Sequence, residues 1–429
     1  MRQPVPVPAQ HARSIVIVGA GQAGAQAALA LRDLGFEGAV LLLGDEPHPP
    51  YARPPLSKKF LAGELGGERL YLRPPALYGE RGIDLRLATQ VLRIDREGSC
   101  LQVRGPQGTE RIGYDRLLLA TGAHARELPL PGARHADVLA LRTRADSIAL
   151  RARLAHARHL VVIGGGYVGL EVAATAATAA PGGPRVTVLE RAARLLERVT
   201  TPIVSEHVEQ AHRRHGVAVH CGVQVTGLAF EDERLRGVKT DRGEIAADLV
   251  LVGIGASPNV ALALEAGIAC DDGIVVDASC RTSDRAIYAA GDCTRHPNAL
   301  YGRRLRLESV QNAVDQGGIA AASMLGIEAS YTRVPWFWSQ QYGLKLQSAG
   351  LSEGHDEIIE RGERAADRFA LLYRRGGQLI GVDAVNHPAE YLAARRAIAE
   401  RGELAVPTRA LSASPTSTLA APEPERHTS

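Results

Sequence analysis

The sequence is poor in cysteine, aromatic residues and lysine. Its 429 residues include five cysteines, five Phe, eleven Tyr and two Trp. The cysteine count is odd, and no two cysteines have the C-x-x-C or C-x4-C spacing of a redox dithiol. These absences exclude a disulfide-stabilised scaffold and a local cysteine pair that could accept electrons. We therefore expect free thiols in a reducing compartment.

Charge and hydropathy exclude two further kinds of partner. The 50 basic and 47 acidic residues leave a formal charge of +3, and no run of like charges resembles a nucleic-acid-binding arm. The apolar stretches are strand-sized, well below the roughly 18 residues of a membrane helix. The N-terminal segment MRQPVPVPAQHARS lacks the apolar core of a signal peptide. We expect a cytoplasmic protein of roughly two to four domains that binds neither nucleic acid nor membrane.

Glycine, in contrast, is abundant, with 45 residues, and part of it falls in two similar segments. SIVIVGAGQAGAQAALALRDLG begins at Ser14, and HLVVIGGGYVGLEVAATAATAA begins at His159. Each consists of an apolar strand, a G-x-G-x-x-G turn and an alanine-rich helix. The first glycine permits a tight turn, the second lets the backbone approach a pyrophosphate, and the third lets helix and strand pack closely. These glycines are Gly19, Gly21 and Gly24 in the first segment and Gly164, Gly166 and Gly169 in the second.

An acidic residue follows each of these segments at the same spacing. Asp45 and Glu190 both lie 21 residues beyond the third glycine, where a carboxylate can accept hydrogen bonds from a ribose. The sequence therefore predicts two dinucleotide sites. Glu190 would repel a 2′-phosphate and so favours NADH over NADPH. Because Arg191 and Arg194 stand close by, the strictness of this preference stays open.

The order of the segments predicts the domain organisation. The segments LLLATGA, at Leu117–Ala123, and IYAAGDCTR, which begins at Ile287, lie on either side of the second glycine segment. This order predicts a flavin domain of residues 1–124 and 249–330, interrupted by a nicotinamide domain of residues 125–248. Alternating strands around a Gly376–Gly377 turn, followed by the helical segment PAEYLAARRAIAER, predict a C-terminal α+β domain at 331–410. Residues 411–429 read as a disordered tail.

Three further motifs carry a family resemblance: PYARPPLSK at Pro50–Lys58, LESVQNA at Leu307–Ala313 and PWFWSQQY at Pro335–Tyr342. With the two glycine segments, they make the chain similar to the pyridine-nucleotide-disulfide oxidoreductases. Within that superfamily it resembles the FAD-dependent ferredoxin reductases of bacterial oxygenase systems. The resemblance implies an α/β fold with two Rossmann-like, glutathione-reductase-like domains and a C-terminal α+β domain. It also implies FAD in the first domain, NADH in the second, and a monomer.

The resemblance also implies roles for single residues. Lys58 would lie beside the isoalloxazine ring and pair with Glu171, and these two residues are the expected catalytic pair. Trp338 would either shield the flavin or pack in the core of the C-terminal domain, and the sequence leaves both possibilities open. The remaining positions that match flavin-contacting residues of the family are Ala23, Asp45, Val91, Arg142, Asp292 and Val310.

The missing dithiol favours direct electron transfer from the flavin to an external carrier. FAD stores two electrons and can release them singly, which suits a one-electron [2Fe–2S] ferredoxin. The expected function is ferredoxin–NAD+ reductase, with the ferredoxin feeding a cytochrome P450 monooxygenase or, alternatively, a Rieske ring-hydroxylating dioxygenase. Two alternatives are an NADH:flavin reductase for small acceptors and an NADH-responsive regulatory flavoprotein of the apoptosis-inducing-factor type.

Two sets of surface residues complete the expectations. A ferredoxin dock is expected to be basic, and its candidates are Arg73, Arg303, Arg304 and Arg306. The histidines at 207, 212 and 215 have no clustered cysteine or carboxylate beside them. They therefore predict a solvated helix face and no metal site.

Overall fold

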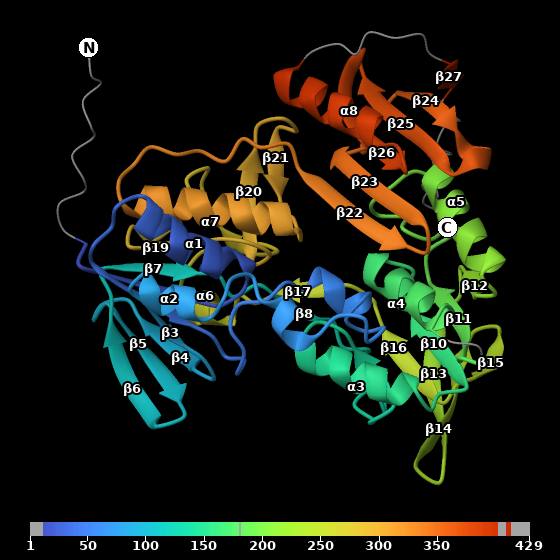
Figure 1. The fold of residues 1–429 in the computed structure, drawn as a ribbon, viewed down its shortest axis with the longest axis horizontal. Coiled ribbons are helices and arrows are strands. Elements are labelled where there is room, and N and C mark those ends of the chain that lie inside the picture. The colour runs from blue at the N-terminus through green and yellow to red at the C-terminus, as the bar shows by residue number, and fades with distance from the viewer. Residues whose placement is uncertain (1–11, 180–181, 402–408, 413–429) are drawn as a thin grey trace, which may run out of the picture. The chain divides into compact units, whose positions relative to one another are not determined.

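The computed structural model describes residues 12–179, 182–401 and 409–412. The chain divides into two compact units, residues 1–347 and 348–429, which we describe separately (Figure 1). Within the described residues, no helix is both long enough and apolar enough to cross a membrane.

The first compact unit contains a parallel five-stranded sheet with the order β19-β7-β1-β2-β3. Helices α1 (Gln22–Asp33) and α7 (Val310–Met324) pack so closely that a Cβ on Gly317 would lie 2.6 Å from the Ala23 carbonyl oxygen. The strands of this five-stranded sheet are mostly apolar, as expected for a sheet covered on both faces. They are β1 (Ser14–Val18), β2 (Ala39–Leu43), β3 (Ile83–Arg86), β7 (Arg116–Leu119) and β19 (Ile287–Ala289).

A second parallel sheet has the order β12-β11-β10-β16-β9 and lies between the segments that build the first. Its helices are α3 (Arg144–Leu154), α4 (Tyr167–Ala177) and α5 (Pro202–Arg214). Its strands are β9 (Val138–Ala140), β10 (His159–Ile163), β11 (Arg185–Glu190), β12 (Ala218–Cys221) and β16 (Leu249–Val252). Along the chain, the strands of this second sheet thus fall between β7 and β19 of the first sheet.

The sheet membership of β16 corrects one predicted boundary. We expected the chain to return to the flavin domain at residue 249, but Leu249–Val252 pairs with β10 on one side and β9 on the other. The four residues of β16 are all buried, as a central strand requires. The apolar run alone did not show which sheet it completes. The second nucleotide-binding fold therefore extends at least to Val252.

Smaller elements complete the first unit. Where the chain passes between the two parallel sheets, β8 (Ala123–Ala125) pairs with β17 (Ala256–Pro258). One antiparallel sheet contains β4 (Gln90–Asp95), β5 (Cys100–Gly105) and β6 (Gly108–Gly113). Another contains β13 (Val225–Glu231), β14 (Arg234–Thr240) and β15 (Gly243–Ala246). The rest are η1 (Pro54–Ser57), η2 (Gly67–Leu70), α2 (Ala76–Glu80), α6 (Ala261–Glu265), β18 (Ile274–Val275), β20 (Thr294–Asn298), β21 (Arg303–Leu305) and β22 (Trp336–Gln341).

The second compact unit begins in β23 (Leu344–Gly350) and is antiparallel. Gly376 and Gly377 join β25 (Arg368–Arg375) to β26 (Gln378–Val385), which confirms the predicted turn. The predicted helix is α8 (Pro388–Glu400). The other elements are β24 (Glu357–Glu363), η3 (Arg364–Ala366) and β27 (Arg409–Ser412). Leu411 and Ser412 end β27, and the rest of the predicted disordered tail lies outside the described residues.

Candidate dinucleotide and electron-transfer site

The first glycine turn joins β1 to α1, and its three glycines differ in what surrounds them. Gly19 has φ +110°, and a Cβ there would lie 2.2 Å from the Ala120 carbonyl oxygen. A Cβ on Gly24 would lie 2.0 Å from the Gly19 carbonyl oxygen. At Gly21, however, no described atom beyond its own chain neighbours lies within 4 Å of the Cβ position. Packing requires the first and third glycines, while the second faces open space.

The second glycine turn, between β10 and α4, repeats this division. Gly164 has φ +109°, and its Cβ would lie 2.4 Å from the Gly253 carbonyl oxygen. A Cβ on Gly169 would lie 2.4 Å from the Gly164 carbonyl oxygen, whereas at Gly166 the nearest described atom is 4.0 Å away. Each turn thus leaves room beside its second glycine, which fits the diphosphate of a dinucleotide.

The helix ends beside these turns fit the same ligand. The N-cap residues of α1 and α4 are Gly21 and Gly166, and neither makes a side-chain capping bond. In contrast, Thr143 caps α3 by accepting from the Asp146 N–H, and Ser309 caps α7. The first N–H groups of α1 and α4 therefore remain available to a phosphate, and the helix dipole favours its negative charge.

The two predicted ribose-binding carboxylates have different surroundings. At the end of β11, Glu190 Oε2 accepts the Gly165 N–H at 2.6 Å, and Oε1 accepts the Ala192 N–H at 2.7 Å. These bonds fix the orientation of the carboxylate beside the second turn. Asp45, two residues beyond β2, is exposed. Its neighbour Glu46, which our sequence reasoning missed, accepts from Tyr51 Oη at 2.5 Å and from Arg53 Nη2 at 2.9 Å.

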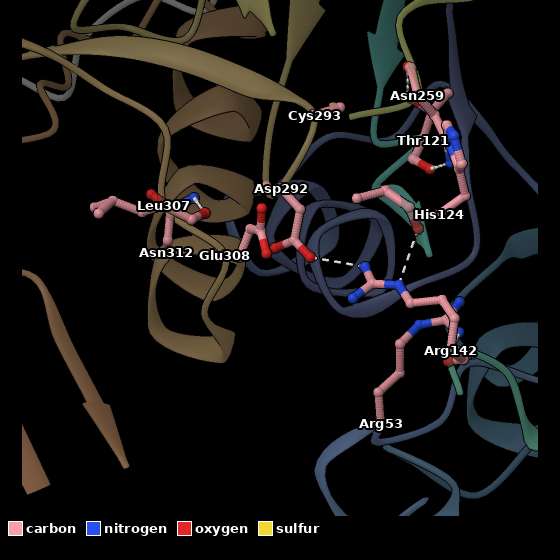
Figure 2. Close-up of polar contacts among 12 residues, drawn as sticks. Arg53, Thr121, His124, Arg142, Asn259, Asp292, Cys293, Leu307, Glu308 and Asn312 are labelled. Atoms are coloured by element: carbon pink, nitrogen blue, oxygen red, sulfur yellow. Dashed lines mark hydrogen bonds and ion pairs between the residues drawn. The ribbon is translucent and has the colours of Figure 1, made fainter. Parts of the chain in front are cut away.

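Arg142 and Asp292, two predicted flavin contacts, lie together although 150 positions separate them (Figure 2). Arg142 Nη2 is 2.7 Å from Asp292 Oδ2, and Arg142 Nε donates to the Ala123 carbonyl at 2.9 Å. Beside Asp292, Gly291 has φ +87°, and a Cβ there would lie 3.1 Å from Ala23 Cβ. The turn after β19 is therefore adjacent to the start of α1.

Lys58 and Glu171 form the buried ion pair that the resemblance implied. Lys58 Nζ is 2.5 Å from Glu171 Oε2, and the Glu171 side chain is 5% exposed. The Lys58 ammonium also donates to the Pro54 carbonyl at 3.1 Å. Pro54 and Pro55 open the 3-10 turn η1, where fixed proline φ angles suit the first positions and hold Lys58 at its end.

Two serines, whose roles sequence reasoning missed, complete the surroundings of Glu171. Ser57 Oγ donates to Glu171 Oε2 at 2.5 Å, and Ser339 Oγ donates to Oε1 at 2.6 Å. Both belong to the quoted PPLSK and PWFWS motifs, which was the only sequence signal for them. Because α4 begins at Tyr167, Glu171 lies in the second turn of the helix. The hydroxyl donors and Lys58, not the helix end, stabilise its charge.

The remaining predicted flavin contacts occupy different surroundings. Val91 lies in β4, is 8% exposed and packs in an apolar cluster that includes Val103. Val310 is the first residue of α7, after its Ser309 cap. Trp338, in β22, is half-buried, with its ring 5.6 Å from that of Trp336. Their neighbour Phe337 packs against Tyr167, the first residue of α4, with ring centroids 4.6 Å apart.

The predicted solvated face was wrong for His207 and His212, whereas His215 is exposed. His207 and His212 are buried, at 6% and 0% exposure, because the apolar face of α5 that carries them packs inward. Burial lowers the pKa of His212, whose Nε2 lies 2.8 Å from Gln341 Oε1. Within the described residues, no cluster of three or more His, Cys, Asp or Glu side chains has the arrangement of a metal site. All five cysteines are free.

Two glycine turns with open second positions, two uncapped helix ends and a buried Lys–Glu pair define an oxidoreductase that binds two dinucleotides. The chain belongs to the pyridine nucleotide-disulphide oxidoreductase family, whose model matches residues 13–317. A reductase C-terminal model matches residues 336–420. Within the family, the chain is an FAD-dependent ferredoxin reductase type of oxidoreductase.

Relatives and solved structures agree with this assignment. The chain is 43% identical over 391 residues to the anthranilate 1,2-dioxygenase system ferredoxin–NAD(+) reductase component of Burkholderia cepacia, covering 90% of this chain and 93% of the relative. It matches the structure of the covalent putidaredoxin reductase–putidaredoxin complex with a TM-score of 0.86 and 42% identity, covering 91% and 93%. The ferredoxin reductase for the CYP199A2 system from Rhodopseudomonas palustris matches with a TM-score of 0.88 and 40% identity, covering 91% and 96%.

The family assignment confirms the predicted cofactors and fold class. The protein is an NADH-dependent oxidoreductase that uses FAD and NAD(H). Its fold consists of Rossmann-like parallel sheets with a C-terminal domain, as the sequence predicted. When bound, FAD accepts a hydride from the nicotinamide and can then release electrons one at a time.

Proposed function

We propose that this enzyme is a ferredoxin–NAD+ reductase that passes electrons from NADH to a [2Fe–2S] ferredoxin. The observation that carries the proposal is the pair of Lys58 and Glu171 in a chain without a redox dithiol. A disulfide reductase of this family needs a cysteine pair beside the flavin. Here all five cysteines are free and none can form such a pair, so electrons must leave for an external carrier.

The residues around the pair have distinct proposed roles. Lys58 would place a positive charge beside the isoalloxazine ring, where it stabilises negative charge that develops on the ring during reduction. Glu171 orients the Lys58 ammonium and balances its charge in a buried place. Arg142 and Asp292 would contact the flavin side of FAD, and Glu190 would accept hydrogen bonds from the NADH ribose.

Two neighbouring lysines allow a matched test of this function. Lys58 pairs with Glu171, whereas Lys59 is exposed. In the Lys58→Met variant we expect stopped-flow reduction of bound FAD by NADH to slow about 100-fold, the usual cost of removing a charge-stabilising group. The Lys59→Met variant should match the wild type. Equal rates in both variants would refute the role of Lys58.

The ferredoxin itself is tested in the oxidative direction. NADH-reduced wild-type enzyme mixed with a [2Fe–2S] ferredoxin should be reoxidised in two successive one-electron steps. Failure to reduce any [2Fe–2S] ferredoxin would overturn the partner assignment. Slow reduction of FAD with a long-lived NADH complex would instead favour the regulatory flavoprotein.

Of the predicted docking arginines, Arg73 suits the role better than Arg306. Arg73 is exposed, whereas Arg306 pairs with both Glu308 and Asp272. Arg304 donates to the Val276 carbonyl at 2.8 Å. We expect Arg73→Glu to weaken ferredoxin reduction at low salt while ferricyanide reduction stays unchanged. If Arg306→Ala weakens ferredoxin reduction more than Arg73→Glu does, this choice is wrong.

We propose that the ferredoxin feeds a cytochrome P450 monooxygenase. The similarity to the reductase for the CYP199A2 system supports this system, while the relative from the anthranilate dioxygenase system supports the Rieske alternative. Reconstitution with each type of oxygenase, and the product formed, distinguishes them. We further propose that the enzyme is a monomer in the cytoplasm, and light scattering of the FAD-loaded protein tests the oligomeric state.

A further inference from the structure

A continuous line of hydrogen bonds leads away from Glu171 on the side opposite Lys58. Ser339 Oγ donates to Glu171 Oε1 at 2.6 Å, and Gln341 Nε2 donates to Ser339 Oγ at 3.2 Å. His212 Nε2 is 2.8 Å from Gln341 Oε1, and Tyr342 Oη is 3.0 Å from His212 Nδ1. The line thus connects α4, β22 and α5, which meet at the end of β22 (Figure 1). We call these four residues, Ser339, Gln341, His212 and Tyr342, the polar chain.

The interior of the polar chain is fully enclosed. Ser339 and His212 are 0% exposed, and Gln341 is 2% exposed. Buried polar groups of this kind are costly unless each has a partner, and here Ser339, Gln341 and His212 each have one on both sides. Tyr342 is half-buried and forms the outer end.

The ionised carboxylate sets the direction of every bond in the polar chain. A carboxylate only accepts, so Ser339 must donate to Glu171 and its oxygen is left to accept from the Gln341 amide. Gln341 therefore turns its carbonyl oxygen to His212, which must carry its proton on Nε2. His212 Nδ1 then accepts from the Tyr342 hydroxyl. Donors aligned in one direction polarise one another, so the polar chain as a whole stabilises the negative charge on Glu171.

The backbone at the outer end supports a specific role for Tyr342. Tyr342 has φ +53°, a conformation that bulky side chains rarely adopt and that persists only when the surroundings hold it. Its ring stacks on His215, with centroids 3.7 Å apart and an interplanar angle of 11°. The Tyr342 and His212 rings also meet in an edge-to-face arrangement, with their centroids 5.1 Å apart. The contacts to His212 in α5 and to His215, which follows the end of α5, thus hold the hydroxyl at His212 Nδ1.

We infer that Ser339, Gln341 and His212 are positioning residues that hold Glu171 as the ionised, correctly oriented partner of Lys58. This inference rests on the proposed role of Lys58 and Glu171 in flavin reduction. The titratable groups that face the polar chain are Lys58 at the Glu171 end, and His215 and Tyr342 at the His212 end. Burial lowers the pKa of His212, so at neutral pH it stays in the neutral form that the direction of the bonds requires.

Interrupting the polar chain at its middle gives the first test. Gln341→Leu removes both the donor to Ser339 and the acceptor for His212. We expect NADH-driven reduction of bound FAD to slow about tenfold, with an unchanged dissociation constant for NADH. We also expect the acid limb of the pH–rate profile to move to higher pH. Without the Gln341 amide, Ser339 becomes a weaker donor to Glu171, and a less stabilised carboxylate is protonated more easily.

Tyr373 provides a matched control in the second compact unit. Its buried hydroxyl donates to Asp383 Oδ2 at 2.7 Å, so Tyr373→Phe removes a buried hydrogen bond that is not connected to Glu171. This variant should leave the flavin reduction rate and its pH profile unchanged. FAD content and thermal unfolding of each variant show whether the protein is folded. If Gln341→Leu and Tyr373→Phe give the same pH profile, the inference fails.

A milder variant and a spectroscopic reading guard against misfolding. Tyr342→Phe keeps the ring on His215 and removes only the outermost donor, so we expect about a twofold slower reduction. In the wild-type holoenzyme, nitrogen-15 NMR should show His212 protonated on Nε2. A His212 ring protonated on Nδ1 would contradict the derived direction, whatever the rates are.

A double-mutant cycle separates this inference from the proposed function. If the polar chain acts through Glu171, Gln341→Leu should have no further effect on the reduction rate in a Glu171→Gln background. Additive effects of the two substitutions would overturn the inference. If Lys58→Met and Glu171→Gln leave the rate unchanged, the proposed function of the pair fails. If they slow it and the polar-chain variants do not, only the inference fails.

Discussion

The two glycine turns of the first compact unit have nearly the same backbone but different surroundings. Gly19 and Gly164 have φ values of +110° and +109°, and each is pressed against a carbonyl oxygen of the neighbouring strand end. Beyond the turns, the similarity ends. Glu190 has both carboxylate oxygens bound by backbone N–H groups, whereas Asp45 is exposed.

The comparison teaches that the phosphate-binding turn and the choice of nucleotide are separate features. The turn depends on close packing within one strand–helix unit, so both copies keep the same glycines. The residues that lie beside the two turns, in contrast, differ. Tyr167 and Phe337 lie beside the second turn, and Gly291 with its neighbour Asp292 lies beside the start of α1.

The largest expected effects come from substituting the first glycine of each turn, because each turn is expected to bind a different dinucleotide. Gly19→Ala would place a Cβ 2.2 Å from a carbonyl oxygen, and we expect a loss in the free energy of unfolding on the order of 4 kcal/mol, together with loss of FAD. Gly164→Ala should keep FAD and lose NADH binding. The FAD-to-protein ratio by absorbance and NADH titration check both outcomes.

Gly79→Ala is the control for this pair of variants. Gly79 lies in α2, where no described atom is within 4 Å of the Cβ position. We expect an unchanged or slightly higher Tm, because alanine favours a helix. Equal FAD loss in the Gly19 and Gly164 variants would contradict the assignment of the two sites.

The next effect concerns pH and a buried histidine in the small sheet β18-β20-β21. His296 in β20 is 1% exposed, and burial lowers its pKa to about 4. Because the unfolded chain binds this proton near pH 6.5, stability should fall as the pH drops from about 6.5 to about 4. The total loss should be on the order of 3 kcal/mol. Denaturant unfolding of the wild type and His296→Phe at pH 7 and pH 4.5 measures it.

The exposed histidine His156 supplies the control. His156→Gln should keep the pH dependence of the wild type, whereas His296→Phe should flatten it. His212 in α5 shows the same direction of pKa shift, so part of the dependence should remain in the His296 variant.

A smaller effect tests the two carboxylates directly. Glu190→Gln removes the charge that repels a 2′-phosphate, so we expect the kcat/KM ratio of NADH to NADPH to fall about tenfold. Asp45→Asn should leave that ratio unchanged and weaken only FAD retention. Better turnover of the wild type with NADPH than with NADH would contradict the role given to Glu190.

The smallest effect uses the contrast between capped and uncapped helices. Thr143 and Asp146 form a reciprocal capping box at the start of α3, whereas α1 and α4 have no side-chain cap. Thr143→Ala should lower the free energy of unfolding by about 1 kcal/mol. Thr109→Ala, at an exposed position of β6, should change it less. Equal losses in the two variants would mean that the capping box adds no more to the free energy of unfolding than an exposed strand threonine does.

The two nucleotide-binding folds were predictable because their signals are local. The glycine spacing, the apolar strand before it and the helix after it lie within about 20 consecutive residues in each copy. The resemblance then supplied Lys58, Glu171, Arg142 and Asp292. The boundary at 248 and 249 was misplaced, because the apolar run Leu249–Val252 would suit either parallel sheet.

The partners of the ion pair could not be predicted in the same way. Ser57 reaches Glu171 across 114 positions and Ser339 reaches it across 168. Serine is common, and no spacing rule connects residues so far apart. The buried state of His212 was also missed, because α5 carries its histidines among charged neighbours.

The sequence by itself determined the two phosphate-binding turns, the interrupted order of the two folds and the absence of a redox dithiol. Each of these depends on residue identity and short-range spacing, since only glycine tolerates the turn geometry and only paired cysteines make a dithiol. The tertiary structure alone decided which hydroxyls contact Glu171, which residues continue that line of hydrogen bonds to His212, and in which direction the bonds run. That outcome depends on long-range packing, because α4, α5 and β22 must meet before Ser339, Gln341 and His212 can exchange hydrogen bonds.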